Sequence, residues 1–379
     1  MYLLEHDAKE LMAQAGIAVP AGCLIEDPEQ IPEGLPPGPW VVKAQVTAGG
    51  RGKAGLIRKA STREEISSLS TQMWGATIKG RTVNAIRVEQ QVADASESYI
   101  ALMVDGAAGA VRIIMAAEGG VDIESLPPEK IRTRVVPAEA RALNAAVVEL
   151  AASWKGAPRA ALRSAGERLA AMFLAREVML AEINPLFVRS DGSWVAGDAK
   201  VVTDENALER QPDIKALLER RAHAYPEADV KRVHGFDYVV VDPDGDIGLL
   251  TTGAGLSMML VDELRQQGLK PYNFLDIRTG GMRGDPARLV SVLEWLAEGR
   301  SIKVLLINIF AGITELGEFS KLLVTALERV PQLRVPVVAR LVGNGLPAAA
   351  PVLEVAGIRL HTDLDAAVQE VRAVLEGSK

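Results

Sequence analysis

Apolar and polar positions follow a regular order along the C-terminal half of the chain. Short apolar runs, among them FDYVVVD, DIGLLTT, YNFLDI, IKVLLINIF and VPVVARLVG, are typical of buried strands. Between them lie segments such as ARLVSVLEWLAEG and AGITELGEFSKLLVTALERV, whose apolar residues recur every three or four positions and predict amphipathic helices. Strands that alternate with helices indicate a parallel sheet with helices on both faces, which is an α/β fold.

The pattern in the N-terminal half is more mixed. A helix is expected over Ala8–Ala15, ended by Gly16, and WVVKAQV after a proline- and glycine-rich stretch predicts a strand. The alanine-rich run Ala138–Leu174 has helical periodicity, and MLAEINPLFV predicts a buried strand that ends at Pro185. We expect two domains with a boundary near residue 235.

Composition narrows the class of protein. The 379 residues exceed one ordinary core, and a net charge of −7 with 4% aromatic residues argues against a nucleic-acid partner. Glu5, Asp7 and Glu10 stand where an export signal is basic or neutral, and apolar runs such as Val304–Phe310 are too short to span a membrane. The single cysteine, Cys23, excludes an intrachain disulfide. We therefore expect a soluble, cytoplasmic protein.

Three of the predicted C-terminal strands end in glycine-containing loops. These loops are TTGAGL from Thr251, DIRTGGM from Asp276 and NIFAGIT from Asn308. In a parallel sheet they emerge at one carboxyl edge, where backbone N–H groups and helix N-termini favour an anionic ligand. Tight strand-to-helix turns explain one such loop alone, but three at one edge favour a carboxylate or phosphate site. The spacing matches neither a dinucleotide fingerprint nor a Walker loop.

A basic, glycine-rich loop follows the predicted strand that carries Lys43. In VVKAQVTAGGRGKAG, this strand lysine precedes Gly49, Gly50, Arg51, Gly52 and Lys53. Such a loop offers flexible N–H donors and positive charge to a polyphosphate. A surface turn with solvated charges is the alternative, and the segment by itself favours neither.

Two further strand ends carry oxygen ligands. AEINPL places Glu182 and Asn184 on one predicted strand, and AGDAK brings Asp198 fourteen residues after Asn184, with DGS as the turn of a hairpin. An amide oxygen beside a carboxylate suits Mg²⁺. Asn-Pro and Gly-Asp are also ordinary turn residues, so this interpretation stays open.

These segments together resemble a known family, the β subunit of succinyl-CoA synthetase. The similar segments, in order, are HDAKELMAQAGIAVP, VVKAQVTAGGRGKAGL, EGGVDIE, AEINPL, DENALERQPD, GAGLSM, NFLDI and NIFAGI, and they cover nearly the whole chain. The resemblance implies an ATP-grasp domain over residues 1–232. A flavodoxin-like, parallel-sheet CoA-ligase domain would follow over residues 236–379.

The resemblance also implies roles for individual residues. Four residues would hold the nucleotide phosphates, namely Lys43, Gly50, Arg51 and Gly52. Glu89 would lie at a hinge beside the base, Glu97 would bind the ribose, and Val92 would also belong to the nucleotide site. Asn184 and Asp198 would hold Mg²⁺, and Glu182 would be catalytic, facing a phosphohistidine of a partner α subunit. Pro20 matches ATP-specific members of the family, and use of GTP stays open.

The implied reaction joins an acid to CoA at the expense of ATP, which becomes ADP and phosphate. None of the four histidines (His6, His223, His234 and His361) lies in a glycine-flanked phosphohistidine motif. The α subunit would therefore carry both that histidine and the CoA site, in an αβ or α₂β₂ assembly. The competing interpretations are a stand-alone ATP-grasp ligase and a nucleotide-binding regulatory paralogue without turnover.

The sequence departs from the family where the acid would bind. The family usually has asparagine where Thr252 stands and a three-glycine run where Arg278 enters. After Gly312 the family continues Ile-Val-Arg-Cys-Asp, whereas this chain continues with Ile313 and then departs from Thr314 onward. The predicted substrate site comprises five residues of these loops, Thr252, Arg278, Gly312, Ile313 and Thr314. The changes fit an acid with more polar groups, such as malate or citrate, and they equally fit sequence drift in a succinate enzyme.

Overall fold

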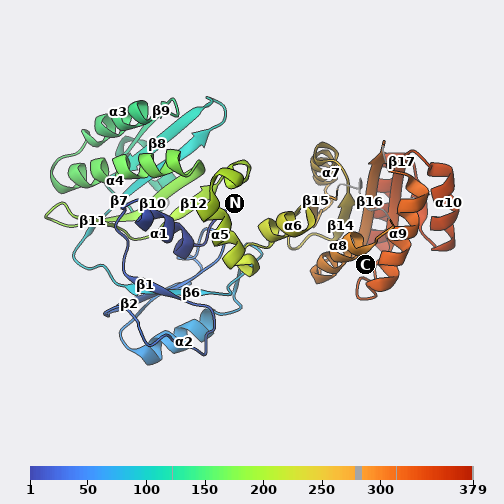
Figure 1. Ribbon diagram of the computed structural model, residues 1–379, viewed down its shortest axis with the longest axis horizontal. Coiled ribbons are helices and arrows are strands. Elements are labelled where there is room, and N and C mark those ends of the chain that lie inside the picture. Colours follow the sequence, from blue (N-terminus) through green and yellow to red (C-terminus); the bar gives the residue numbers. More distant parts are fainter. Residues whose placement is uncertain (122, 278–283, 313, 378–379) are drawn as a thin grey trace. The chain divides into compact units, whose positions relative to one another are not determined.

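The computed structural model describes residues 1–121, 123–277, 284–312 and 314–377, and the chain divides into two compact units (Figure 1). Unit 1 comprises Met1–Tyr225, and unit 2 begins at Pro226. The contacts thus group helix α6 (Pro226–His234) with unit 2. The domain ranges expected from the sequence, 1–232 and 236–379, stay a prediction.

A four-stranded antiparallel sheet with one covering helix forms the first part of unit 1. In spatial order its strands are β1 (Gly22–Ile25), β6 (Ile86–Gln90), β2 (Trp40–Ala44) and β3 (Ile57–Ala60). Helix α2 (Arg63–Met73) packs on this sheet through Ile66 and Met73, and the Thr62 hydroxyl caps it by accepting from the Glu65 amide at 3.2 Å. A small hairpin of β4 (Thr77–Ile78) and β5 (Arg81–Thr82) follows.

A larger antiparallel sheet forms the rest of unit 1. Its strands are β11 (Trp194–Ala196), β10 (Val178–Val188), β7 (Ser96–Asp105), β8 (Ala110–Ala116) and β9 (Ile131–Val136), and β12 (Lys200–Thr203) also pairs with β10. Helices α3 (Ala140–Ala151) and α4 (Gly156–Ala175) pack against it and against each other (Figure 1). The shorter helical segments are η1 (Ile123–Ser125), η2 (Pro128–Lys130), η3 (Glu205–Arg210), α5 (Pro212–Arg220) and η4 (Ala222–Ala224).

The N-terminal residues run beside strand β12. The amino group of Met1 donates to the Thr203 carbonyl at 2.9 Å, and the Leu3 amide donates to the Val201 carbonyl at 3.0 Å. Helix α1 (Glu5–Gln14) follows and buries an apolar face, and Gly16 ends this segment at φ +75°. The predicted first helix is therefore present, and the pairing with β12 sets the position of its first residue.

The helical periodicity of the alanine-rich run is confirmed, and the run forms two helices, because the chain turns after α3 and resumes at Gly156, whose φ is +62°. One prediction for unit 1 is wrong in detail. Strand β10 does not end at Pro185 but continues to Val188. Its register with β7 shifts between Ile183 and Leu186, so Pro185 occupies an irregular stretch that requires no N–H donor. The predicted β10–β11 hairpin is confirmed.

Unit 2 contains the predicted parallel sheet. Strands β14 (Ile247–Thr251), β16 (Val304–Ala311), β17 (Val337–Gly343) and β18 (Arg359–His361) are all parallel. Strand β15 (Asn273–Asp276) lies beside β14, and backbone hydrogen bonds join the two segments at both ends of β15. Between these ends, the side-chain amide of Asn273 accepts from the Leu249 N–H and donates to the Leu249 carbonyl. Strand β13 (Asp237–Val240) is the exception, since it pairs antiparallel with β15.

Helices cover both faces of this sheet and bury two separate apolar clusters. One cluster lies under α8 (Ala287–Glu298), α9 (Leu316–Arg329) and α10 (Leu346–Val355), and the other under α7 (Ala254–Gln266) and α11 (Leu364–Gly377). The alternation of strand and helix therefore confirms the α/β prediction. Among the helices of the described residues, none has the length and apolarity needed to cross a membrane.

Candidate nucleotide site

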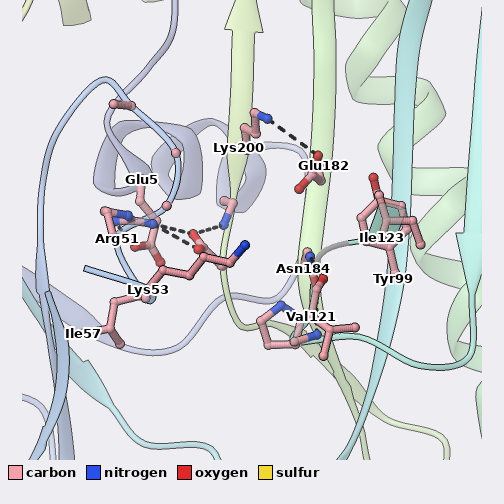
Figure 2. A pocket seen from close by; sticks show the side chains of 18 of the residues that line it. Glu5, Arg51, Lys53, Ile57, Tyr99, Val121, Ile123, Glu182, Asn184 and Lys200 are labelled. Atoms are coloured by element: carbon pink, nitrogen blue, oxygen red, sulfur yellow. Dashed lines mark hydrogen bonds and ion pairs between the residues drawn. The ribbon is translucent and has the colours of Figure 1, made fainter. Parts of the chain in front are cut away.

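Unit 1 contains a cavity of about 760 Å³ between its two sheets (Figure 2). The glycine-rich loop borders it on the side of the four-stranded sheet, and strand β10 borders it on the side of the larger sheet. Of the predicted site residues, six line this cavity: Gly50, Arg51, Gly52, Glu182, Asn184 and Asp198. The basic loop and the acidic strand, far apart in sequence, thus meet in one place.

The glycine-rich loop presents its basic side chains to this cavity. Gly50 has a φ of +99°, a conformation that glycine adopts without the steric cost of a Cβ atom. Lys53 extends from the loop into the cavity (Figure 2). On the other side, Tyr2 lines the cavity, with the ammonium of Lys200 5.5 Å from its ring centroid. The loop is therefore shaped for an anionic ligand.

Arg51 is buried and joins two carboxylates. Its Nη1 lies 2.6 Å from Oε2 of Glu5 and donates to the Ala44 carbonyl at 3.0 Å. Its Nη2 donates to both oxygens of Asp198, at 2.9 and 3.0 Å. The predicted phosphate ligand and the predicted metal ligand are therefore in direct contact.

Lys43 and Glu89 lie behind the cavity wall rather than on it. The ammonium of Lys43 lies 2.8 Å from Glu5 and 2.7 Å from Glu89, and donates to the Gly197 carbonyl at 2.7 Å. Glu89 also contacts Lys9 at 2.6 Å and Arg87 at 2.7 Å. We call the seven linked charged residues the buried ion cluster: Glu5, Lys9, Lys43, Arg51, Arg87, Glu89 and Asp198.

The cluster keeps its two most buried carboxylates ionised. Burial by itself raises the pKa of Glu5, but Lys43, Lys9 and Arg51 outweigh it and hold this pKa well below its ordinary value. The pKa of Glu89 is likewise lowered, because Lys9 and Lys43 overcome the effect of burial. Both side chains are therefore anionic at neutral pH.

Sequence reasoning missed Glu5, Lys9 and Arg87 as members of this site. A signal was present for the first two, since Glu5 and Lys9 are four positions apart on the helical face that also carries Ala8 and Met12. Charged residues on an apolar face point to a buried pair. The sequence contained no comparable signal for Arg87.

Glu182 occupies the middle of strand β10 on the opposite wall. Burial raises the pKa of its carboxyl, Asp198 adds to this rise, and Lys200, whose ammonium lies 3.9 Å away, opposes it. Tyr99, on the neighbouring strand β7, also lines the cavity, and its hydroxyl lowers the pKa of the Glu182 carboxyl in part. Figure 2 shows Glu182, Tyr99 and Asn184 on the same side of the cavity.

Asn184 ties a glycine-containing loop to strand β10. Its Oδ1 accepts from the Gly120 amide at 2.8 Å, and its Nδ2 donates to the Val121 carbonyl at 3.0 Å. Glu97 lies against the same loop, since a Cβ on Gly120 would stand 1.8 Å from its Oε2. Glu97 is exposed and Val92 is half-buried, and neither lines the cavity. The predicted contact of Glu97 with the ribose and the predicted contact of Val92 with the nucleotide stay predictions.

The predicted substrate residues lie in unit 2. Thr252 is buried directly after β14, Gly312 is exposed after β16, and Thr314 is half-buried just before α9. Because β14 and β16 are parallel and pair Thr251 with Asn308, both loops emerge at one edge of the sheet. Arg278 and Ile313 lie outside the described residues.

Comparison with known proteins places both units in described families. Residues 2–188 match the profile of the ATP-grasp domain, and residues 250–374 match that of the CoA-ligase family. The chain is 35% identical to the β subunit of ADP-forming succinate–CoA ligase from Gemmatimonas aurantiaca, over 97% of each chain. It is 36% identical to the β subunit of the GDP-forming enzyme from Thermus thermophilus, over 100% of each.

Among solved structures, the chain resembles ATP citrate lyase from Methanothrix soehngenii in complex with citrate and coenzyme A. The TM-score is 0.69 at 20% sequence identity, and the alignment covers 99% of both chains. At this identity the likeness shows a shared fold.

Proposed function

Because the chain belongs to the family of succinate–CoA ligase β subunits, we propose that it is the nucleotide-binding subunit of an ADP-forming acid–CoA ligase. The observation that carries the proposal is the cavity of unit 1, where Arg51 and the glycine-rich loop face Glu182, Asn184 and Asp198. Basic groups and backbone N–H donors on one wall, with oxygen ligands on the other, are what a metal-bound nucleoside polyphosphate requires.

The residues of the cavity fit Mg²⁺. Asn184 and Asp198 present an amide oxygen and a carboxylate, the hard ligands that this ion prefers. When bound, the ion neutralises part of the phosphate charge during phosphoryl transfer. Arg51 and Lys53 would hold the phosphate oxygens, and Glu182 would orient the group that accepts or donates the phosphoryl.

The phosphoryl acceptor belongs, on this proposal, to a second polypeptide. Among the described residues that line the cavity there is no histidine. An α subunit would supply the histidine that becomes phosphorylated and the CoA site. The covalent phosphohistidine divides one difficult transfer into easier steps, and the chain by itself would be inactive.

The identity of the acid substrate is the part of the proposal that the sequence determines least. Succinate is favoured by the names of the relatives, and a hydroxylated or larger polycarboxylate such as malate or citrate is the second candidate. Thr252 and Thr314 follow strands that end at the carboxyl edge of the unit 2 sheet, and on this proposal they would contact a substrate hydroxyl. A site built for a hydroxyl discriminates against an acid without one, because its polar groups stay unpaired.

A panel assay tests the function directly. The purified chain is mixed with its α subunit, CoA, Mg²⁺ and either ATP or GTP, and acyl-CoA formation is measured with succinate, malate and citrate. We expect ATP-dependent acyl-CoA formation that requires both polypeptides. Arg278→Ala, assigned to the acid, should raise the KM for the preferred acid and leave the KM for ATP unchanged. Acyl-CoA formation with none of the acids, or phosphohistidine formation on this chain alone, would contradict the proposal.

A further inference from the structure

The two terminal nitrogens of Arg51 have different surroundings. Nη1 faces the interior, where it contacts Glu5 and the Ala44 carbonyl. Nη2 faces Asp198, whose side chain is 28% exposed, whereas the side chain of Glu5 is 1% exposed. One half of the guanidinium is therefore fixed in the interior, and the other half contacts a partner that a ligand can reach.

Glu5 is held firmly enough to act as the fixed partner. Lys9 lies 2.7 Å and Lys43 2.8 Å from its Oε1, so three cations surround this one carboxylate. Glu5 is also the first residue of helix α1, where the helix dipole favours a negative charge. The pairing of Leu3 with β12 and the buried side chain of Leu11 fix the position of that helix.

The charges of the buried ion cluster are nearly balanced without a nucleotide. Four cationic side chains face three carboxylates. If Asp198 turns to a metal ion, the four cations keep only Glu5 and Glu89 as partners. The positive charge left over then lies at the cavity wall formed by Arg51, where polyphosphate oxygens can take the place of Asp198.

We propose that Arg51 exchanges partners through Nη2, from Asp198 to a phosphate oxygen of the Mg²⁺-bound nucleotide, while Glu5 holds Nη1 in place. Asp198 is thereby released for the metal ion. Glu5 is then a positioning residue of the nucleotide site, although it contacts neither nucleotide nor metal. This inference rests on the proposed function, since it requires that unit 1 binds a nucleotide with Mg²⁺.

The proposal makes a specific statement about metal dependence. Without the Glu5 carboxylate, the guanidinium keeps Asp198 as its carboxylate partner and withholds it from the metal. Glu5→Gln should therefore weaken Mg·ADP binding about tenfold or more, the factor that one hydrogen bond to a charged group is worth. Binding of ADP without Mg²⁺ should change much less, because the positive charge facing the phosphates is retained.

The test is calorimetric titration of the full chain with ADP, with and without Mg²⁺. Asp7→Asn is the matched control, because Asp7 is a fully buried carboxylate on the same helix but pairs with Arg221 and Tyr225. This control should cost stability and leave the ratio of the two affinities unchanged. Glu5→Asp keeps the charge but shortens the side chain, and should show an intermediate ratio. It decides the matter if Glu5→Gln does not fold.

Three results would overturn the inference. The first is a folded Glu5→Gln variant whose ratio of ADP affinities with and without Mg²⁺ equals that of the wild type, which would show that Glu5 does not position the nucleotide site. If Glu5→Gln does not fold, a wild-type ratio in Glu5→Asp leads to the same conclusion. An equal loss in Asp7→Asn assigns the effect to general destabilisation. If the wild-type chain itself binds no Mg·ADP, the proposed function fails and the inference fails with it, whereas the first two results leave the proposed function intact.

Discussion

At the scale of single residues, burial shifts two titratable groups of unit 1 in opposite directions. It raises the pKa of Glu182, because the charged carboxylate is the form that loses solvation. It lowers the pKa of His6 to about 3, and the neighbouring cations Arg87 and Arg221 add to that shift. Each group therefore changes its charge at a pH that differs from the one expected for its residue type, and each pKa shift has a measurable consequence.

The first prediction concerns Glu182 and phosphoryl transfer. Its raised pKa means that the carboxylate is lost earlier than an ordinary glutamate as the pH falls, so turnover of the complex should decline on the acidic side. Glu182→Gln should remove this acidic limb and slow phosphohistidine formation about 100-fold, with Mg·ADP affinity unchanged. Rapid-quench measurement of labelled phosphohistidine checks the rate. An unchanged pH profile in the variant would assign the limb to another group.

The second prediction concerns stability and His6. In the folded chain its Nδ1 lies 2.9 Å from Nη1 of Arg87, so the neutral ring accepts that bond. The pKa of His6 is lower in the folded chain than in the unfolded chain, so neutral His6 contributes to the free energy of unfolding. This contribution is fully present above about pH 6.5 and is lost as the pH falls towards 3. At pH 5 the loss amounts to about 2 kcal/mol.

His6→Gln keeps a hydrogen-bond acceptor and removes the titration. Its thermal midpoint should therefore fall less than that of the wild type between pH 7 and pH 5, as followed by circular dichroism. Equal falls in both proteins would show that the charge of His6 does not contribute to the acid sensitivity of unit 1.

At the scale of elements, the loop after strand β8 depends on two close-packed glycines. A Cβ on Gly119 would stand 2.3 Å from the Ser98 carbonyl oxygen, and Gly120 packs against Glu97 with a φ of +71°. The bonds of Asn184 to this loop connect its backbone to strand β10. The loop therefore holds one of the predicted metal ligands in place, and its glycines are required by packing as well as by backbone conformation.

Gly120→Ala should therefore weaken both stability and nucleotide binding. Gly109→Ala is the control, because Gly109 lies in the β7–β8 turn at φ +59° with nothing within 4 Å of the methyl group that alanine would add. Both substitutions cost about 1 kcal/mol for the left-handed backbone conformation. Only Gly120→Ala should also displace Glu97 and lower Mg·ADP affinity, measured by calorimetry. Equal effects at the two positions would mean that the loop does not support the site.

At the scale of the whole molecule, the two units have separate cores and separate predicted tasks. The cavity proposed for the nucleotide is lined by residues of unit 1, and the predicted acid-binding residues lie in unit 2. Tyr225 is the last residue of unit 1 and is attached to its N-terminal segment, since its fully buried hydroxyl donates to Asp7 and accepts from the Leu4 amide. Unit 1 therefore includes this residue, although it lies after the last strand and helix α5.

A fragment of residues 1–225 should fold and bind Mg·ADP with an affinity within about threefold of the full chain, because it contains all the predicted ligands. A fragment of residues 1–220 should be less stable, since it lacks Arg221 and Tyr225 and leaves the buried Asp7 carboxylate unpaired. Thermal unfolding and calorimetry compare the two. Failure of the longer fragment to fold would show that the units depend on each other.

The sequence by itself determined the order of elements and the family. Apolar runs and helical periodicity predicted β14, α8, β16 and α9 in unit 2, and the confirmed β10–β11 hairpin followed from its turn residues. These features depend on a few neighbouring residues, which is why local patterns predict them. The motifs that led to the nucleotide cavity are also local, and the residues Gly50, Arg51 and Gly52 form one continuous loop.

Only the tertiary structure decided which charges meet. Arg51 and Asp198 are 147 positions apart, and no local pattern connects them. The same holds for Lys43 and Glu89, expected at the nucleotide and found in the buried ion cluster, and for Glu5, which the sequence marked only as an acidic residue near the N-terminus. Charged side chains interact weakly at a protein surface and strongly when they are buried together. That coupling depends on the packing of distant segments, which periodicity and spacing along the chain do not encode.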